Sequence, residues 1–145
     1  MAVQMCISEA AMAAMLDAFN THVGSGATLR FYSGTAPTDC ETALSGNTLL
    51  AQVSLNSTPF SSATTGTNLA TLALDVTGGL SDTDADAAGT ASFARIVKSD
   101  GTTVALQGNV ATSAAAFTSA NITIAENGTV TVQSWSFSQS TGDQF

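Results

Sequence analysis

The sequence predicts a mainly β protein: an antiparallel, jelly-roll-like β-sandwich with one N-terminal helix. Two observations lead to this fold class. Stretches in which apolar and polar residues alternate recur along most of the chain, and this is the period of strands with one buried face. Clusters rich in Gly, Asn and Asp separate these stretches and favour turns. Seven or eight short strands spaced in this way indicate antiparallel pairing rather than strand–helix–strand units.

One helix is predicted, between residues 9 and 23. Ser8 before it is a good N-cap, and Gly24 after it is a good stop. Apolar side chains recur at spacings of three and four along one face: Met12, Met15, Leu16, Phe19 and Val23. We expect this face to pack on the sheet of the same domain; the alternative is a helix that docks on a partner. The chain is therefore predicted to be a single domain, with an arm and helix over 1–26 and the sandwich over 27–145.

The first strand is predicted within LRFYSGTAP, residues 29–37. Alternation places Leu29 and Phe31 on the core side. Pro37 lacks the N–H that a ladder needs, so the strand ends before it. The Thr-x-x-Glu spacing that follows is that of a capping box, and it predicts a helical turn over about 39–44.

Further strands are predicted by the same alternation. They are 49–55, 70–76, 90–98, 104–110, 122–124 and 130–137. The sequence SDGT at 99–102 is typical of a hairpin turn. Residues 56–68 are predicted to be a mobile, turn-rich loop. The last two strands are predicted to pair with each other across the Glu-Asn-Gly turn.

The final strand contains a change of phase. Val130 and Val132 are in one phase, whereas Trp135 and Phe137 are in the other. A bulge near residues 133–134 would bring all four side chains to one face. The predicted core comprises Phe31, Val53, Leu72, Leu74, Phe93, Val104 and Trp135.

Charged side chains are scarce, at 10% of the chain against the roughly 25% of an ordinary soluble domain. Three cations, Arg30, Arg95 and Lys98, stand against eleven acids, for a net charge of −8. Nucleic-acid binding depends on Lys and Arg that neutralise phosphates, so DNA and RNA are excluded as partners. An anionic membrane surface is disfavoured for the same reason. A positively charged protein surface remains compatible.

The start of the chain shows no signal for secretion or for a membrane. MAVQMCISEAAMAAML has no basic region and carries Glu9 early, so we expect no signal peptide. No run approaches the roughly 18 apolar residues typical of a membrane span. Cys6 and Cys40 lack metal-ligand spacing, and we expect free thiols in a reducing cytoplasm. A single bridge between them is the alternative.

No motif of an enzyme is visible, so no catalytic residue and no cofactor are predicted. His22 is the only histidine, and a Ser–His or Cys–His mechanism would have to use it. It ends the predicted helix, where a solvated imidazole or a partner of the helix dipole is expected. No nucleophile elbow frames a serine.

The most site-like run is LSDTDADAAG, with Asp82, Asp84 and Asp86 two residues apart. Carboxylates at this spacing could converge on a hard cation such as Ca²⁺. Counted as an EF-hand loop, however, Ala87 stands where glycine is needed and Phe93 stands where glutamate is needed. We expect a solvated loop without a metal; a calcium site is the alternative.

Four stretches together resemble a family of small virion structural proteins of tailed bacteriophages. They are LRFYSGTAP, GNTLLAQVSL, DADAAGTASFARIVKSDGTTVALQGNV and NGTVTVQSWSFS, within residues 27–137. The resemblance implies a non-enzymatic head decoration (cement) protein, made in the host cytoplasm and carried on the capsid surface of the virion. The implied partners are the major capsid protein and further copies of the chain, with a homotrimer favoured. A tail, neck or baseplate component and a carbohydrate-binding or adhesion module are the alternatives.

Five residues are predicted as candidates for contacts between subunits: Val3, Met5, Ile7, Pro59 and Phe60. The first three precede the helix and have no obvious place in the sandwich. Exposed apolar groups of this kind usually mark an interaction site. The other two lie in the loop predicted over 56–68.

Overall fold

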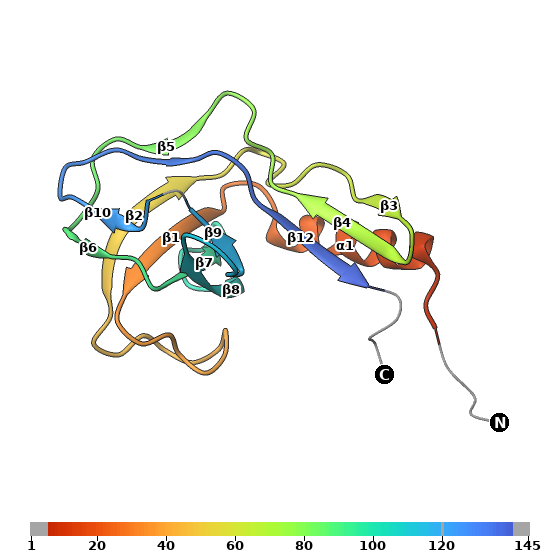
Figure 1. Ribbon diagram of the computed structural model, residues 1–145, viewed down its shortest axis with the longest axis horizontal. Coiled ribbons are helices and arrows are strands. Elements are labelled where there is room, and N and C mark those ends of the chain that lie inside the picture. Colours follow the sequence, from red (N-terminus) through yellow and green to blue (C-terminus); the bar gives the residue numbers. More distant parts are fainter. Residues whose placement is uncertain (1–5, 120, 141–145) are drawn as a thin grey trace.

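The computed structural model describes residues 6–119 and 121–140 of the chain. The fold class predicted from the sequence, mainly β and antiparallel with one N-terminal helix, is confirmed (Figure 1). The elements are α1 Glu9–Val23, β1 Thr28–Ser33, β2 Thr48–Ser54, β3 Thr64–Gly66, β4 Leu69–Ala73, β5 Leu80–Asp82, β6 Gly89–Thr90, β7 Phe93–Val97, β8 Val104–Ala111, β9 Phe117–Thr118, β10 Thr123–Ile124, β11 Val130–Val132 and β12 Ser136–Ser140.

The largest sheet has five strands in the order β2-β1-β7-β8-β9. Its pairs are antiparallel except β8 and β9, which run parallel. Smaller sheets of order β10-β6 and β11-β5 lie across from it, and a third, β12-β4-β3, extends to the side where α1 packs against β4. Figure 1 shows this last sheet and α1 at one end of the molecule and β10 at the other.

The predicted strand at 49–55 contains a bulge. Phe31 lies opposite Ala51 whereas Tyr32 lies opposite Leu49, so Leu50 has no opposing residue. Leu50 and Ala51 are both buried as a result, although neighbours on a regular strand point to opposite faces.

Helix α1 packs on its own domain, as the sequence indicated. The hydroxyl of Ser8 accepts a hydrogen bond from the backbone N–H of Ala11, which caps the first turn. Met12, Leu16 and Val23 are buried, whereas Met15, predicted in the same stripe, is 56% exposed. The Asn20 amide donates to the carbonyl of Phe60 at 2.8 Å and accepts from the N–H of Phe60 at 3.2 Å. These two bonds fix the helix to the segment between β2 and β3.

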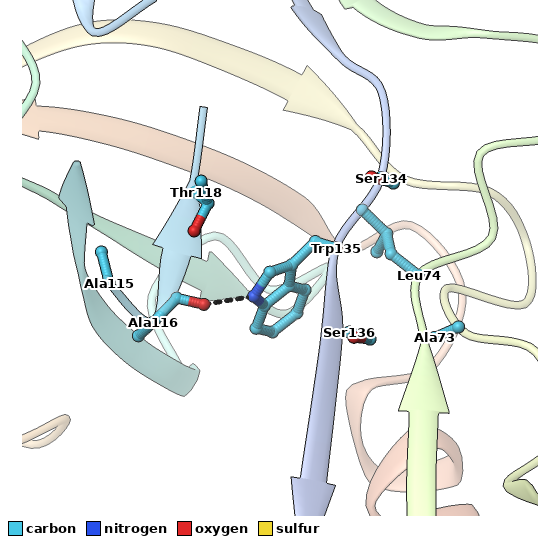
Figure 2. Close-up of a pocket in the computed structure, with 8 residues that line it drawn as sticks. All are labelled: Ala73, Leu74, Ala115, Ala116, Thr118, Ser134, Trp135 and Ser136. Atoms are coloured by element: carbon cyan, nitrogen blue, oxygen red, sulfur yellow. Dashed lines mark hydrogen bonds between the residues drawn. The ribbon is translucent and has the colours of Figure 1, made fainter. Parts of the chain in front are cut away.

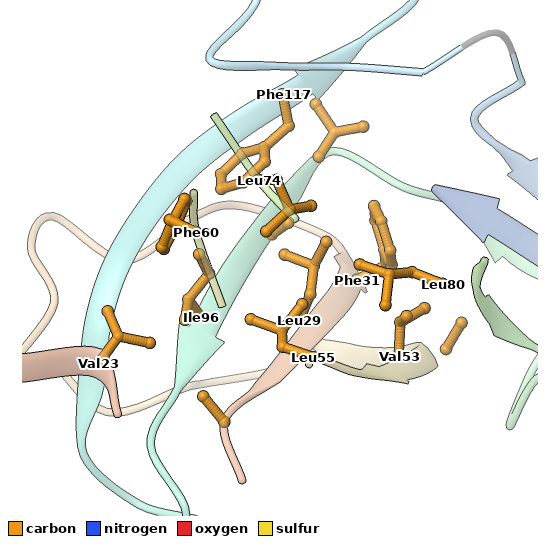
Figure 3. Packing of buried hydrophobic residues seen from close by; sticks show 14 of the residues in the cluster. Val23, Leu29, Phe31, Val53, Leu55, Phe60, Leu74, Leu80, Ile96 and Phe117 are labelled. Atoms are coloured by element: carbon orange, nitrogen blue, oxygen red, sulfur yellow. The ribbon is translucent and has the colours of Figure 1, made fainter. Parts of the chain in front are cut away.

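Most of the predicted core is confirmed (Figure 3). Buried members are Phe31, Val53, Leu72, Leu74 and Phe93. Trp135 is half-buried against the core, and Val104 is half-buried on β8. Phe93 is buried on the outer face of the five-stranded sheet, stacked on Tyr32 with ring centroids 5.2 Å apart. Both faces of β7 are therefore covered, and every residue of β7 is buried.

The helical turn predicted over 39–44 is wrong, since this stretch forms bends. The carboxylate of Asp39 accepts a hydrogen bond from the N–H of Thr42 at 2.6 Å. A side-chain bond of this kind offers the backbone an alternative to a helix. Hydrogen bonds from Thr42 also hold the pKa of Asp39 below its ordinary value.

The turn-rich loop predicted over 56–68 also contains a strand, which the sequence did not predict. It contains β3, which pairs antiparallel with β4, and Phe60 bridges to Leu74. The aromatic ring of Phe60 lies in the core, and burial of a side chain of this size draws the segment inward.

The pairing predicted between the last two strands is wrong. β10 pairs with β6, β11 pairs with β5, and β12 pairs with β4. The turn between β10 and β11 is fixed to Ala85, whose N–H donates to Gly128 and whose carbonyl accepts from Asn127. This anchor directs the two strands to different partners.

The predicted change of phase is present. The strand breaks between β11 and β12, and Val130, Val132, Trp135 and Phe137 all pack against the core.

Candidate functional site

The described residues 6–119 and 121–140 contain no group of three His, Cys, Asp or Glu side chains arranged to hold a metal ion. His22 is exposed in the last turn of α1. Cys6 and Cys40 are free thiols, as expected. Nor does the described part contain a helix long and apolar enough to cross a bilayer.

The acidic run has a structural use at its first carboxylate. Asp82 accepts hydrogen bonds from the N–H of Gln52 at 2.9 Å and from that of Asp84 at 3.0 Å. The first bond ties β2 to the end of β5. Asp84 and Asp86 are exposed. The three carboxylates therefore do not act as one group, and Asp82 secures the two layers to each other.

Two of the three cations face each other on the five-stranded sheet. Arg30 on β1 lies directly opposite Arg95 on β7. Each guanidinium is held by a glutamine on the neighbouring strand, with Arg30 Nε donating to Gln52 and Arg95 Nε donating to Gln107, both at 2.7 Å. These amide acceptors orient the two like charges side by side.

Arg95 is only 4% exposed, and the segment between β1 and β2 covers it. Its Nη2 donates to the carbonyls of Asp39 at 3.3 Å and Thr42 at 3.0 Å, and the Gln107 amide donates to the carbonyl of Pro37 at 2.8 Å. A guanidinium stays charged at every accessible pH, so these neutral acceptors take the place of its water. Residues 34–47, the excursion between β1 and β2, are thereby held across the outer face of the sheet.

A hollow in the described structure lies between β1 and the segment 117–135. It has a volume of about 580 Å³, and β9, β10 and β11 all contribute to its wall. Leu29 and Phe31 line it from the core side. No residue of this lining carries a charge, and its polar groups are hydroxyls and amides of Thr, Ser, Asn and Gln.

A second cavity of about 340 Å³ lies beside the first, and Trp135 lines both (Figure 2). Figure 2 shows the indole between Ala116 on one side and Leu74 on the other. The indole N–H donates to the carbonyl of Ala116. Trp135, with Thr118 and Ser134, borders both cavities, and its hydrogen bond connects the 112–119 segment to the start of β12.

Two aromatic rings lie against the indole of Trp135. Phe117 stacks on Trp135 with ring centroids 4.3 Å apart, and Phe60 lies tilted against it at 5.7 Å. Phe117 therefore occupies one face of the indole. The uncharged lining of the cavity, part apolar and part hydroxyl and amide, fits an uncharged group.

The five residues predicted to contact other subunits differ in how far they are buried. Pro59 and Phe60 are buried in the chain's own core, so their prediction as an exposed interface is wrong. Ile7 is half-buried against the core. Val3 and Met5 lie outside the described residues.

Sequence reasoning missed the cavity. Several of its wall residues, among them Phe31, Val130 and Trp135, are predicted from the sequence, but only as residues that face the core. Residues 112–119, TSAAAFTS, show neither strand nor helix spacing. The hollow arises where three short strands from different sheets meet, and no local pattern reports such a meeting.

Comparison of the chain with protein-family models, curated proteins and solved structures gave no match.

Proposed function

We propose that this chain is a non-enzymatic virion structural protein of a tailed bacteriophage, and specifically a capsid decoration protein that binds the outer surface of the head shell. A protein of this kind adds contacts across the junctions of capsid subunits. Copies that associate around a symmetry axis multiply weak individual contacts through avidity. We propose a homotrimer as the associating unit.

The observation that best supports this proposal is the place in the fold of the four stretches that resemble virion structural proteins. LRFYS forms β1, TLLAQVS forms β2, and FARIV and VALQGNVA form β7 and β8, which are four neighbouring strands of one sheet. The closing stretch supplies β11 and β12. Most of the resemblance thus lies on four adjacent strands of one sheet.

The surface chemistry is compatible with contact rather than catalysis. Asp82 and Arg95 are charged groups of the kind that reactive sites use, but both are engaged in holding β2, β5 and the 34–47 excursion. With eleven acids against three cations, a partner surface of positive potential would be attracted.

The test uses shells assembled from the major capsid protein that the proposal requires, which is to be sought among the genes that neighbour the gene for this chain. Purified protein added to undecorated shells should bind in a saturable manner and raise the melting temperature of the shell. Purified tails and bovine serum albumin serve as controls for location and for nonspecific stabilisation. Binding confined to tails would instead support the tail, neck or baseplate alternative, and absence of binding to heads would refute decoration.

A further inference from the structure

We infer that the 580 Å³ cavity between β9, β10 and β11 is the docking site for residues 2–6 of a second copy of this chain. The inference rests on the self-association proposed above, but not on binding to a capsid shell.

The backbone around the cavity is suited to receive a strand. β9 ends the five-stranded sheet, β10 ends the β10-β6 pair, and β11 ends the β11-β5 pair. The last strand of a sheet has one row of N–H and C=O groups outside the ladder, and extended peptides commonly add to such an edge. Three edges of this kind border one hollow.

The lining specifies an uncharged occupant with apolar side chains. Leu29, Phe31 and Phe117 give the cavity apolar surface, while threonine, serine and asparagine supply hydrogen-bonding groups. The volume lies within the roughly 300–1,000 Å³ of ordinary ligand sites. A charged group placed here would lose its hydration without gaining an opposite charge.

Residues 1–7, MAVQMCI, have the composition that this cavity requires. They include no charged side chain, and Val3, Met5 and Ile7 alternate with Ala2, Gln4 and Cys6. Alternation of this kind is typical of a strand with one apolar face. Ile7 packs against its own core, which leaves Val3 and Met5 as the alternating apolar residues that precede it.

The distance within one chain favours a neighbouring copy as the source. Glu9, at the start of α1, accepts a hydrogen bond from the N–H of Asn68 at 2.7 Å, beside the turn between β3 and β4. Figure 1 shows the start of α1 at the end of the molecule opposite β10. Ile7 packs on its own core, and the four extended residues from Ile7 back to Val3 span at most about 14 Å. This reach is less than the roughly 21 Å rise of α1 from end to end.

The first experiment measures the association of the full chain by analytical ultracentrifugation. Wild type should self-associate, whereas the Val3→Asp/Met5→Asp double variant and Thr118→Arg should raise the dissociation constant at least about tenfold. Thr118 is exposed and lines the cavity, so an arginine there blocks it without entering the core. Thr48→Arg, an exposed strand position on β2 that does not line the cavity, is the matched control and should associate as wild type does.

The second experiment uses Trp135, the only tryptophan, as a reporter in the cavity wall. A synthetic peptide of residues 1–7 added to the double variant should shift the Trp135 emission in a saturable manner. The same peptide with Asp at positions 3 and 5 should not, and neither should the normal peptide added to a variant that also carries Thr118→Arg.

Three results would overturn the inference: a monomeric wild type, undiminished association of the double variant, or no response of Trp135 to the peptide. Loss of this docking with shell binding intact would leave the proposed decoration function standing. Docking without any shell binding would leave this inference standing.

Discussion

Phe117 on β9 and Trp135 at the start of β12 stack with ring centroids 4.3 Å apart and ring planes 23° apart. The pair joins the edge of the five-stranded sheet to the sheet that carries α1. A stacked aromatic pair contributes about 0.5–1.5 kcal/mol beyond the area it buries. Because β9 is only two residues long, this contact and the bond from Trp135 to Ala116 hold it in place and define the shape of both cavities.

Gly108→Ala should displace β9. A Cβ at Gly108 would lie 2.6 Å from the Cβ of Ala116 and 2.9 Å from the ring of Phe117, so the strand must move. We expect a loss of about 1–3 kcal/mol in the free energy of unfolding and a changed Trp135 emission, measured by urea denaturation. Gly66→Ala, where a Cβ would have its nearest neighbour at 4.0 Å, is the control and should be close to neutral. Equal effects at both sites would contradict this account of β9.

Arg95→Ala should loosen the 34–47 excursion. The substitution leaves the carbonyls of Asp39 and Thr42 and the Gln107 amide without their buried donor. We expect the free energy of unfolding to fall by about 3 kcal/mol, and limited proteolysis to cut within 34–47. Lys98→Ala, directly after the same strand, should stay within about 0.5 kcal/mol of wild type. A protease-resistant excursion in Arg95→Ala would show that other contacts hold it.

Asp82→Ala should destabilise the protein through the lost bonds to Gln52 and Asp84. We expect a loss of about 1 kcal/mol in the free energy of unfolding, whereas Asp84→Ala should change it by less than about 0.5 kcal/mol. Calcium should leave the melting temperature of wild type unchanged. A calcium-dependent rise of several degrees that Asp84→Ala abolishes would restore the metal-site alternative.

Asp100 should make stability depend on pH in the acid range. Hydrogen bonds from the hydroxyl and N–H of Thr103, together with that of the Thr102 N–H, hold the pKa of its carboxyl far below the ordinary value. A pKa depressed in the folded state contributes stability that is present above the unfolded pKa of about 3.9 and is lost as pH falls below it.

The measurement compares wild type with Asp100→Asn by urea denaturation across this range. The advantage of wild type should be full at neutral pH and should shrink as the pH falls below about 4. Thr103→Val should raise the pKa of Asp100 towards its ordinary value, as followed by NMR titration. An advantage that is constant with pH would show that the ionised carboxylate has no special role in the turn.

The sequence by itself determined the elements whose signals are local. The alternation of Leu29 and Phe31 with their neighbours predicted which face of β1 lies on the core. The SDGT turn predicted the β7–β8 hairpin, and Ser8 and Gly24 predicted the ends of α1. The phase change before Trp135 also correctly predicted that both halves of the last strand pack on the core. Each of these features depends on residues a few positions apart, and period and capping report such features directly.

Only the tertiary structure decided which strands pair at the end of the chain, what Phe60 and Arg95 do, and where a cavity forms. β10, β11 and β12 pair with three different partners because the turn between β10 and β11 is hydrogen-bonded to Ala85. Ala85 lies more than forty positions before Asn127 and Gly128, the turn residues that it bonds. Phe60 is buried because Asn20 satisfies both of its backbone groups, forty positions away. Hydrogen bonds over such separations leave no period in the sequence, since they depend on how whole sheets come together.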